Sequence, residues 1–319
     1  MGIDDCPELL VIGGTGFIGQ HVLKKAAKLG WSVTSFSLRE DNLSFQSDKI
    51  KYRQVDVTNS ENLRRLDKKS FDYVINLGGY INHAKFYEGG REIIQAHFES
   101  VLNLIAWIDQ KRLKKFIQIG SSDEYGGALA PQNEILREDP ISSYSLGKVS
   151  STHFLQMLSK TENFPATILR LFLTYGPGQL PSRFLPQIIS SCLDDLEFPT
   201  SAGGQLRDFC YVEDVVSAIF CALNCPQANG EVFNIASGIP VSIKSVIDEV
   251  CAQIGRGTPL YGRFPYRVGE NMELFADVKK AKKILMWEPV IPFELGLSKT
   301  VAFYQNQRNK NEFFSSTSC

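Results

Sequence analysis

The chain has 319 residues, of which 43% are hydrophobic and 22% charged, so it can bury a sizeable core in one large or two closely joined domains. Its formal net charge is -1 and no long Lys/Arg block stands out, which argues against nucleic acid or an anionic membrane as a partner. No basic region followed by a long apolar stretch opens the sequence, and no apolar run reaches membrane length. We therefore expect a cytoplasmic protein with no membrane and no nucleic-acid partner.

Cysteine and histidine spacing gives no sign of a metal site. The seven cysteines are an odd number without paired metal spacing, and the four histidines are dispersed along the chain. Cys221 and Cys225 lie one helical turn apart, but no histidine cluster accompanies them. We expect no bound metal, and we interpret most of the cysteines as small buried apolar residues.

The first predicted strand, 9–12, ends in the spaced glycines Gly13, Gly16 and Gly19, and a helix begins near Phe17. Gly13 allows a tight turn, Gly16 lets a phosphate approach the backbone, and Gly19 lets the helix pack close to the strand. Free N–H groups and the positive dipole end of the helix favour an anion there. The pattern predicts a site for a dinucleotide pyrophosphate.

Apolar runs then alternate with helical patterns, which is typical of a doubly wound parallel sheet. The predicted elements are strands at 32–36, 51–55, 73–77, 116–119 and 166–171, with helices beginning near Ser60, Glu92 and Ser143. The fold class is therefore α/β: a Rossmann sheet with helices on both faces, formed by residues 1–173. Ligands should bind at the carboxyl ends of the strands.

Beyond residue 173 the pattern changes to Gly/Pro-rich turns and shorter helices, predicted at 184–192, 212–223 and 243–254. We expect residues 174–304 to form mainly a smaller α/β lobe that binds substrate. The strand-like run 231–235 is able to return to the main sheet. The polar residues 305–319 are expected to be a flexible tail.

Tyr144 and Lys148 stand four residues apart at the start of a predicted helix, so both side chains share one face. A phenol has a reference pKa near ~10, and a nearby ammonium group and a nicotinamide cation favour its phenolate. Ser121 follows the strand 116–119 and should reach the same edge of the sheet. A tyrosine there is able to exchange a proton with a substrate hydroxyl or carbonyl group.

Several further motifs share the spacing of one known family. They are Ser-Ser-Asp-Glu-Tyr-Gly at 121–126, Tyr-Gly-Pro-Gly-Gln at 175–179, and the runs 207–215, 233–238, 267–270, 276–281 and 287–289. Together with the glycine turn, they make the chain resemble the extended short-chain dehydrogenase/reductase family, in its nucleotide-sugar epimerase, dehydratase and 4-ketoreductase branch. The resemblance runs from Leu9 to about Tyr304.

The resemblance implies a site and an assembly. Ser121, Tyr144 and Lys148 would be catalytic together with Asp123, and Tyr144 would be the proton donor or acceptor. A nucleotide-diphosphate sugar would be the substrate, and a homodimer would form through the helices that contain 103–108 and 144–158. The implied cofactor-binding residues are Gly13, Gly16, Phe17, Ile18, Gly19, Ser37, Arg39, Asp56, Val57, Leu77, Gly78, Tyr144 and Lys148. The implied substrate-binding residues are Ser122, Asp123, His97, Arg183, Arg207 and Arg267.

Some of these residues also have a plain structural interpretation. Asp56 is able to cap a turn, and Arg207 is able to pair locally with Asp208. His97 stands where the family usually has Asn, and it is equally interpreted as a satisfied buried histidine. Asp214 is equally interpreted as a structural residue near the start of a helix.

The residues after the second strand bear on the choice of cofactor. NAD-preferring members of the family carry an acid there, whereas this chain has Ser37 and Arg39, which are able to bind a 2′-phosphate. We therefore predict NADP(H). Glu40 and Asp41 would supply the missing acid if the strand ends later, and Arg39 would then be a solvent-facing loop residue.

The predicted reaction depends on the residues after Ser121. Family dehydratases commonly carry Asp-Glu there, and the ungapped alignment places Ser122-Asp123 at that pair, whereas a gapped one places Asp123-Glu124. We predict NADPH-dependent reduction of the 4-keto group of a nucleotide-linked 4-keto-6-deoxyhexose, with Tyr144 as proton donor. The alternatives are a nucleotide-sugar 4-epimerase or 4,6-dehydratase with tightly held NAD(P), and a non-catalytic NADP(H)-binding regulator.

Overall fold

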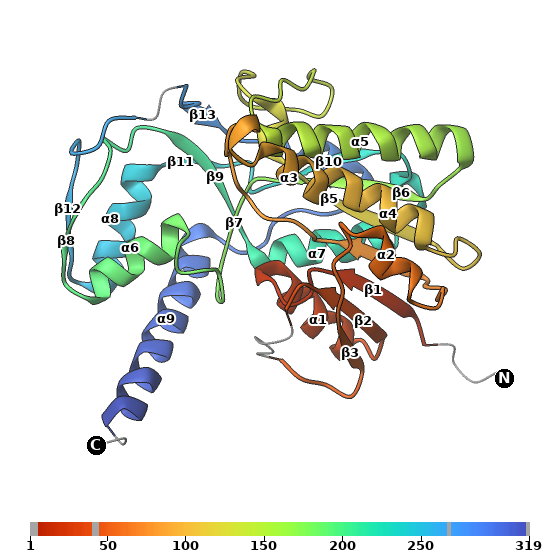
Figure 1. Cartoon of the computed structure of the whole chain (residues 1–319). Coiled ribbons are helices and arrows are strands. Elements are labelled where there is room, and N and C mark those ends of the chain that lie inside the picture. The colour runs from red at the N-terminus through yellow and green to blue at the C-terminus, as the bar shows by residue number, and fades with distance from the viewer. Residues whose placement is uncertain (1–5, 40–44, 267–268, 317–319) are drawn as a thin grey trace.

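The computed structural model describes residues 6–39, 45–266 and 269–316 (Figure 1). Its main sheet has seven parallel strands in the order β10-β6-β5-β4-β1-β2-β3. The strands are β1 (Glu8–Ile12), β2 (Ser32–Ser37), β3 (Ile50–Gln54), β4 (Tyr73–Asn76), β5 (Lys115–Ser121), β6 (Ala166–Leu171) and β10 (Val232–Ile235). This order reverses direction between β1 and β4, and such a switch point is where this class of sheet binds ligands.

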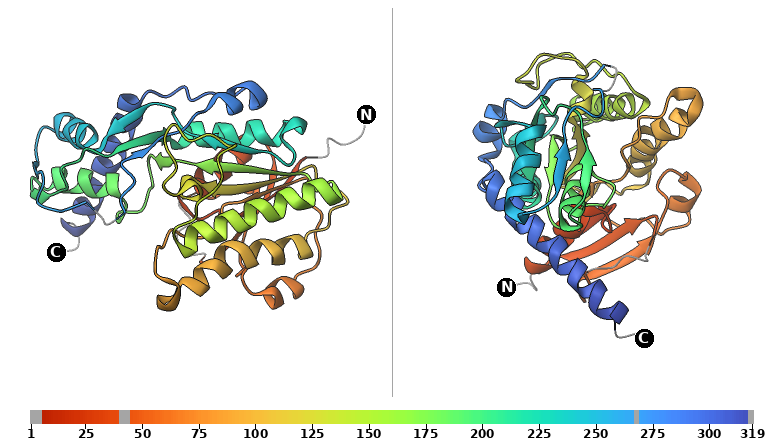
Figure 2. Two further views of the ribbon diagram at one scale, coloured as in Figure 1. Left: turned by 90° about the horizontal axis from the view of Figure 1, so that it is seen from above. Right: turned by 90° about the vertical axis from the view of Figure 1, so that its left-hand side faces the viewer.

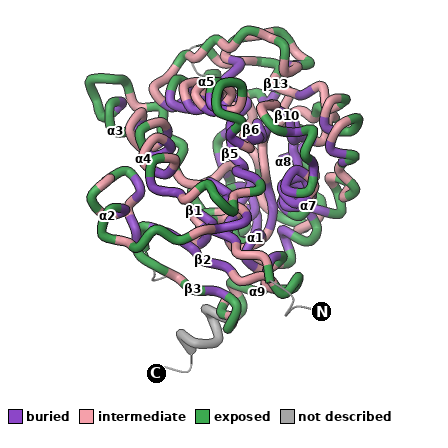
Figure 3. The backbone as a smooth tube through the Cα atoms, turned by 90° about the vertical axis from the view of Figure 1, so that its right-hand side faces the viewer, coloured by how far each residue is buried: buried purple, intermediate pink, exposed green. Residues whose placement is uncertain are grey.

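Helices cover both faces of the sheet. Side chains alternate along a strand, so Leu9 and Val11 pack on one side with α1 (Phe17–Lys28) and α7 (Val212–Leu223). Leu10 and Ile12 pack on the other side with α2 (Ser60–Arg64), α4 (Ser100–Trp107) and α5 (Ser143–Glu162). The left view of Figure 2 shows α4 and α5 lying side by side across the sheet, and the central strands in Figure 3 are largely buried. The predicted Rossmann architecture is confirmed.

Two elements of the main unit differ from the sequence-based expectation. The helix predicted near Glu92 is a 3-10 turn (Phe86–Glu88), α3 (Gly90–Ile94), a π-helical turn (Gln95–Glu99) and then α4. The π turn contains the buried His97, and such turns are frequent at functional sites. Strand β5 continues two residues beyond the predicted end, so Ser121 is its last residue.

The second unit is built around a four-stranded sheet, in which β9 (Leu206–Tyr211) pairs with β7 (Leu173–Tyr175), β11 (Pro240–Ser242) and β13 (Glu273–Leu274). A separate pair joins β8 (Glu197–Pro199) to β12 (Thr258–Leu260). Helices α6 (Phe184–Leu193), α8 (Ile243–Ile254) and α9 (Phe293–Ser316) bury a core of their own against these strands. Short helical turns at Pro226–Ala228 and Ala281–Leu285 return to the main unit, where Ala228, Ala281 and Leu285 join the core of the main sheet.

The expected flexible tail is a helix over most of its length. Helix α9 continues to Ser316, and Figure 1 shows it projecting from the second unit. Residues 305–316 contain neither Gly nor Pro and include several good helix formers, so a helix that has already begun can propagate through them. Among the described helices, none combines the length and the apolar character that a bilayer span requires.

The turn between β1 and α1 requires glycine at Gly13 because of its backbone conformation and at Gly19 because of its close packing. Gly13 has φ +77° and its N–H donates to the Phe36 carbonyl at 2.7 Å, which ties the turn to β2. A Cβ atom on Gly19 would lie 2.2 Å from the Gly13 carbonyl oxygen and 2.7 Å from the Gly14 Cα. Helix α1 therefore packs directly on the backbone of the turn.

We predict that Gly19→Ala destabilises the protein by about 3 kcal/mol, because the new methyl group meets backbone atoms that cannot rotate away. The matched control is Gly127→Ala, since nothing lies within 4 Å of the corresponding position there. The control should change the free energy of unfolding by no more than about 0.5 kcal/mol. Urea denaturation of the two variants measures both values, and equal effects would contradict the prediction.

Candidate active site

The glycine turn and the end of β4 meet at the switch point of the sheet. A Cβ atom on Gly13 would lie 3.1 Å from the Leu77 carbonyl oxygen and 3.4 Å from the Gly78 nitrogen. The Gly78 N–H donates to the Asn76 side chain at 3.0 Å, which fixes the chain as it leaves β4. Three of the positions predicted to bind the dinucleotide are thus in direct contact.

Ser121, Tyr144 and Lys148 lie together near the loop that follows β4, where His83 contacts the Tyr144 ring. Helix α5 begins with a capping box, in which the Ser142 hydroxyl accepts from the Ser145 N–H at 3.1 Å, and Tyr144 follows in the first turn. The Tyr144 hydroxyl forms a hydrogen bond with the Ser121 side chain. One turn on, the Lys148 Nζ donates to the Ile119 carbonyl at 2.8 Å and lies 5.9 Å from the Tyr144 ring centroid.

Burial sets the protonation of these groups. It raises the pKa of Tyr144 well above its ordinary value, and the hydrogen bond with Ser121 offsets part of that shift. Burial lowers the pKa of Lys148 to about 8, against the opposing effect of the Glu124 carboxylate. The phenol therefore keeps its proton in this arrangement, which suits a proton donor.

His97 packs against Tyr144 from the π turn. The two rings meet edge to face at 4.8 Å and 89°, and the His97 Nε2 lies 2.9 Å from the Tyr80 carbonyl oxygen. Its Nδ1 is buried and has no hydrogen-bond partner among the described residues. Burial, followed by the Lys148 charge, lowers the pKa of His97 to about 3. The geometry matches a buried neutral histidine rather than a substrate contact.

This burial gives His97 a pH-dependent effect on stability. The unfolded histidine takes up a proton below about pH 6.5, whereas the folded one resists it until the pH approaches 3, so acid favours unfolding. Between pH 7 and 5 we expect His97 to remove about 2 kcal/mol from the free energy of unfolding. In His97→Asn, the free energy of unfolding should no longer fall by this amount between pH 7 and 5. Urea denaturation at both pH values measures the change.

The matched control is His153→Asn, which removes an exposed histidine that pairs with Glu138 at 3.2 Å on a different surface. This control should keep the wild-type loss of stability on acidification. The interpretation of His97 would be wrong if both variants, or neither of them, changed the pH dependence.

Asp123 lies in the 3-10 turn after Ser121 (Ser122–Tyr125), among positive groups. Burial raises the pKa of its carboxyl group, while His83, Arg183 and Arg207 lower it. The charges of both Asp123 and Arg183 act on Tyr144 as well. Arg183 and Arg207 therefore act electrostatically on Asp123, and Asp123 and Arg183 act on Tyr144, while Ser122 lies buried in the same turn as Asp123.

Arg207 does not form the local pair with Asp208. Its guanidinium group pairs with Glu270 and also donates to the Leu206 carbonyl at 2.8 Å. Asp208 is instead buried and accepts the N–H groups of Ser237, Gly238 and Ala276. Arg267, the remaining predicted substrate contact, lies outside the described residues.

Glu124 turns away from solvent into the core. Its Oε1 accepts the Ser121 N–H at 2.8 Å, and its Oε2 accepts from Arg170 Nε and Thr152 Oγ1, each at 2.9 Å. The Glu124 side chain is fully buried, and the guanidinium group of Arg170 also pairs with Glu138. Of the two carboxylates that the alternative alignments proposed, Asp123 is the one that is partly open to solvent.

His83 is a site residue that the sequence analysis missed. It lies in the loop after β4, its ring meets the Tyr144 ring edge to face at 5.6 Å, and its Nε2 is 3.6 Å from Asp123 Oδ2. A lone histidine in a loop carries no periodic signal. Its position shortly after a strand that ends at the ligand edge was the signal available in the sequence.

The residues predicted around the adenosine end have well-defined local roles. The Ser37 hydroxyl accepts the Thr15 N–H at 3.3 Å, which joins the end of β2 to the glycine turn, and Arg39 is exposed beside it. Glu40 and Asp41, the alternative acids, lie outside the described residues. Asp56 caps a turn by accepting from the Thr58 N–H at 2.9 Å, and Val57 is buried.

Asp214 has the structural role that the sequence allowed. Its two carboxylate oxygens accept the N–H groups of Val290 at 3.1 Å and Ile291 at 3.0 Å. The indole N–H of Trp287 donates to the Asp214 carbonyl at 3.1 Å. The start of α7 thus anchors the chain segment that leads into α9.

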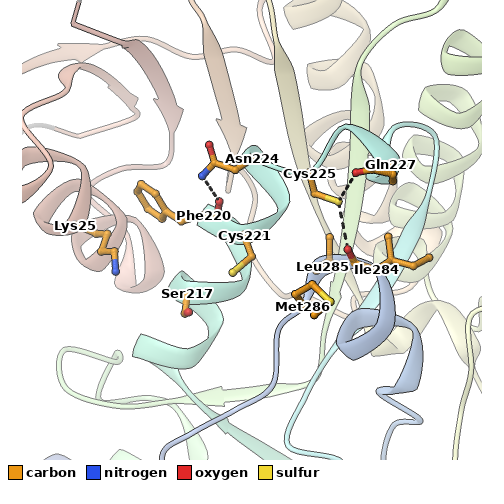
Figure 4. Close-up of a pocket in the computed structure, with 10 residues that line it drawn as sticks. All are labelled: Lys25, Ser217, Phe220, Cys221, Asn224, Cys225, Gln227, Ile284, Leu285 and Met286. Atoms are coloured by element: carbon orange, nitrogen blue, oxygen red, sulfur yellow. Dashed lines mark hydrogen bonds between the residues drawn. The ribbon is translucent and has the colours of Figure 1, made fainter.

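A separate pocket lies on α7, and none of the residues predicted to bind the cofactor or the substrate lines it (Figure 4). It is lined by α1, α7 and the π turn Ala281–Leu285, and it contains Cys221 and Cys225. The Cys225 thiol donates to the Ile284 carbonyl at 3.4 Å. Within the described ranges, no group of three or more His, Cys, Asp and Glu side chains is arranged to hold a metal ion.

The sequence matches one protein-family model over residues 9–236, which is more than half of the chain. The model describes the NAD dependent epimerase/dehydratase family. The chain belongs to this family. The resemblance to the nucleotide-sugar branch of the extended short-chain dehydrogenases/reductases is thereby confirmed.

Relatives in the family are similar along nearly the whole chain. A UDP-glucuronate 4-epimerase from Thermodesulfobacterium geofontis is 26% identical over 307 residues, covering 92% of this chain and 94% of the relative. A dTDP-glucose 4,6-dehydratase from Neisseria meningitidis serogroup B is 26% identical over 335 residues and covers 94% of both chains. The crystal structure of UDP-glucose 4-epimerase from Thermotoga maritima with UDP-glucose has a TM-score of 0.83 and 26% identity, covering 94% of this chain and 99% of that one.

These similarities place the protein among enzymes of the nucleotide-sugar epimerase/dehydratase class. The similar proteins are 4-epimerases and 4,6-dehydratases, so they favour the alternative activities over the 4-ketoreductase expected from the sequence.

Proposed function

We propose that this protein is a nucleotide-sugar 4-epimerase that works with a tightly held NAD(P). The observation that carries the proposal is Tyr144, hydrogen-bonded to Ser121 and beside Lys148, at the sheet edge where the glycine turn meets β4. Inversion at C4 needs one group that removes and returns the proton of the C4 hydroxyl. Tyr144 is placed to be that group.

The carboxylates near Tyr144 favour epimerisation over dehydration. Elimination across C5 and C6 needs a base for the C5 proton and an acid for the departing hydroxyl group. Ser122 has no titratable side chain, and both oxygens of Glu124 are occupied by buried donors. Asp123 alone of these three is a partly exposed carboxylate, so the turn does not present the Asp-Glu pair that the family's dehydratases commonly carry.

Each residue has a defined task in the proposed reaction. As the phenolate, which the Lys148 charge and a nicotinamide cation would favour, Tyr144 takes the proton from the C4 hydroxyl and then returns it. Ser121 hydrogen-bonds the same oxygen. A bound nicotinamide would supply the chemistry of taking up and returning the hydrogen of C4. Arg183 and Arg207 offer cations to the diphosphate of the substrate.

Cofactor choice and assembly stay at the level of predictions. The exposed Arg39 beside Ser37 supports NADP(H) over NAD, because a guanidinium group is able to pair with a 2′-phosphate. The homodimer is expected through the helical segments 103–108 and 144–158, which belong to α4 and α5.

Cofactor retention separates an epimerase from a reductase. We expect the purified protein to interconvert a UDP-hexose and its C4 epimer without added nicotinamide, and to release NAD(P) only on denaturation. Product analysis measures the interconversion at C4, and absorbance of the cofactor released on denaturation measures its retention. Stoichiometric consumption of added NADPH with a 4-keto sugar, and no C4 inversion, would contradict the proposal and favour the reductase.

The proposed reaction depends on the hydroxyl group of Tyr144. Tyr144→Phe should lower the epimerisation rate by about 10²- to 10⁴-fold, which is the range that a positioned acid-base group contributes. The matched control is Tyr87→Phe, because Tyr87 is 97% exposed and lies outside the site, and its turnover should equal that of wild type. Tight NADP(H) binding with no turnover of any nucleotide sugar would instead support the regulator.

A further inference from the structure

His83 and Asp123 form a polar pair at the open side of the Tyr144 ring. Their side chains are 49% and 32% exposed, and His83 Nε2 lies 3.6 Å from Asp123 Oδ2. The His83 ring stands edge to face with Tyr144 at 5.6 Å and 72°, whereas the buried His97 contacts the same ring. The pair comes from two different strand ends, the loop after β4 and the turn after β5.

Stability does not account for this arrangement. A pair with these exposures contributes at most about 1 kcal/mol, because water screens the charges. The proposed 4-epimerisation does not use it either, since Tyr144 handles the C4 hydroxyl. The two groups nevertheless lie next to the tyrosine that would contact the substrate oxygen.

The chemistry of the proposed intermediate gives the pair a task. Oxidation at C4 produces a ketone, and a ketone makes the hydrogens on the neighbouring carbons, C3 and C5, more acidic. A neutral imidazole has one ring nitrogen with a free lone pair, so it is able to accept a proton. A carboxylate beside the ring stabilises the imidazolium that forms.

We infer that His83, supported by Asp123, is a second proton-transfer group that acts on the carbon next to the C4 ketone. The imidazole accepts the proton of C3 or C5, and the C–H electron pair forms the carbon–carbon double bond of an enolate whose charge rests on the C4 oxygen. Tyr144 and Ser121 hydrogen-bond that oxygen. Return of a proton from the imidazolium regenerates the ketone, with or without inversion of the carbon.

The inference rests on the proposed function, because oxidation at C4 is the source of the ketone. The test does not depend on that oxidation. The probe is UDP-4-keto-6-deoxyglucose in D2O, which already carries the ketone and needs no oxidation at C4. Wild-type protein should speed deuterium incorporation at C3 or C5 over the enzyme-free rate, as followed by NMR and mass spectrometry. His83→Gln should lower this catalysed rate by about 10²-fold.

Two further variants identify the pair. Asp123→Asn should slow the exchange by about 10-fold, because His83 stays in place but loses the charge that stabilises its imidazolium. His153→Gln removes the exposed histidine that pairs with Glu138, and it should exchange as wild type does. Unchanged exchange in His83→Gln would overturn the assignment.

The inversion of a UDP-hexose at C4, measured on the same preparations, keeps the two proposals apart. Inversion at C4 without any catalysed exchange in the keto-sugar would overturn the role of His83 and leave the 4-epimerase intact. Catalysed exchange that depends on His83, without C4 inversion, would overturn the 4-epimerase and leave the role of His83 intact.

Discussion

The site depends on one buried ion pair beneath it, between Glu124 and Arg170. Glu124 accepts from the Ser121 backbone at the end of β5, from Arg170 in β6 and from Thr152 in α5, so one carboxylate joins three elements. These are the elements that bring Ser121 and Tyr144 together. A charged group removed from water must have partners, and here the requirement for partners fixes the catalytic geometry.

The same burial separates the groups near Tyr144 into a buried set and a partly exposed set. His97 is held neutral, Glu124 is held by its donors, and Lys148 has a lowered pKa. On the open side, Asp123 and His83 remain partly exposed to solvent. The tyrosine ring thus contacts buried groups on one side and the partly exposed His83 on the other.

Most of the fold was predictable because local sequence patterns determine most of its strands, turns and helices. Apolar runs marked the strands, the spaced glycines marked the turn after β1, and the four-residue spacing placed Tyr144 and Lys148 on one face of α5. The roles of Glu124 and His83 were not predictable from spacing, because each depends on a partner far away in the sequence: Arg170 for the first, Tyr144 for the second. The helical end of α9 and the π turn at His97 also depend on context, since polar helix formers and a buried ring give no periodic signal.

The return of β10 to the main sheet ties the two units into one. Strand β10 pairs with β6, and α7 covers one face of the same sheet, although both follow the first strands of the second unit in the chain. A fragment that stopped at residue 173 would leave β6 as an open edge and would remove α7, one of the two helices that cover one face of the sheet. The chain therefore crosses between the two units more than once, so the two halves cannot be exchanged with those of a relative at a single junction.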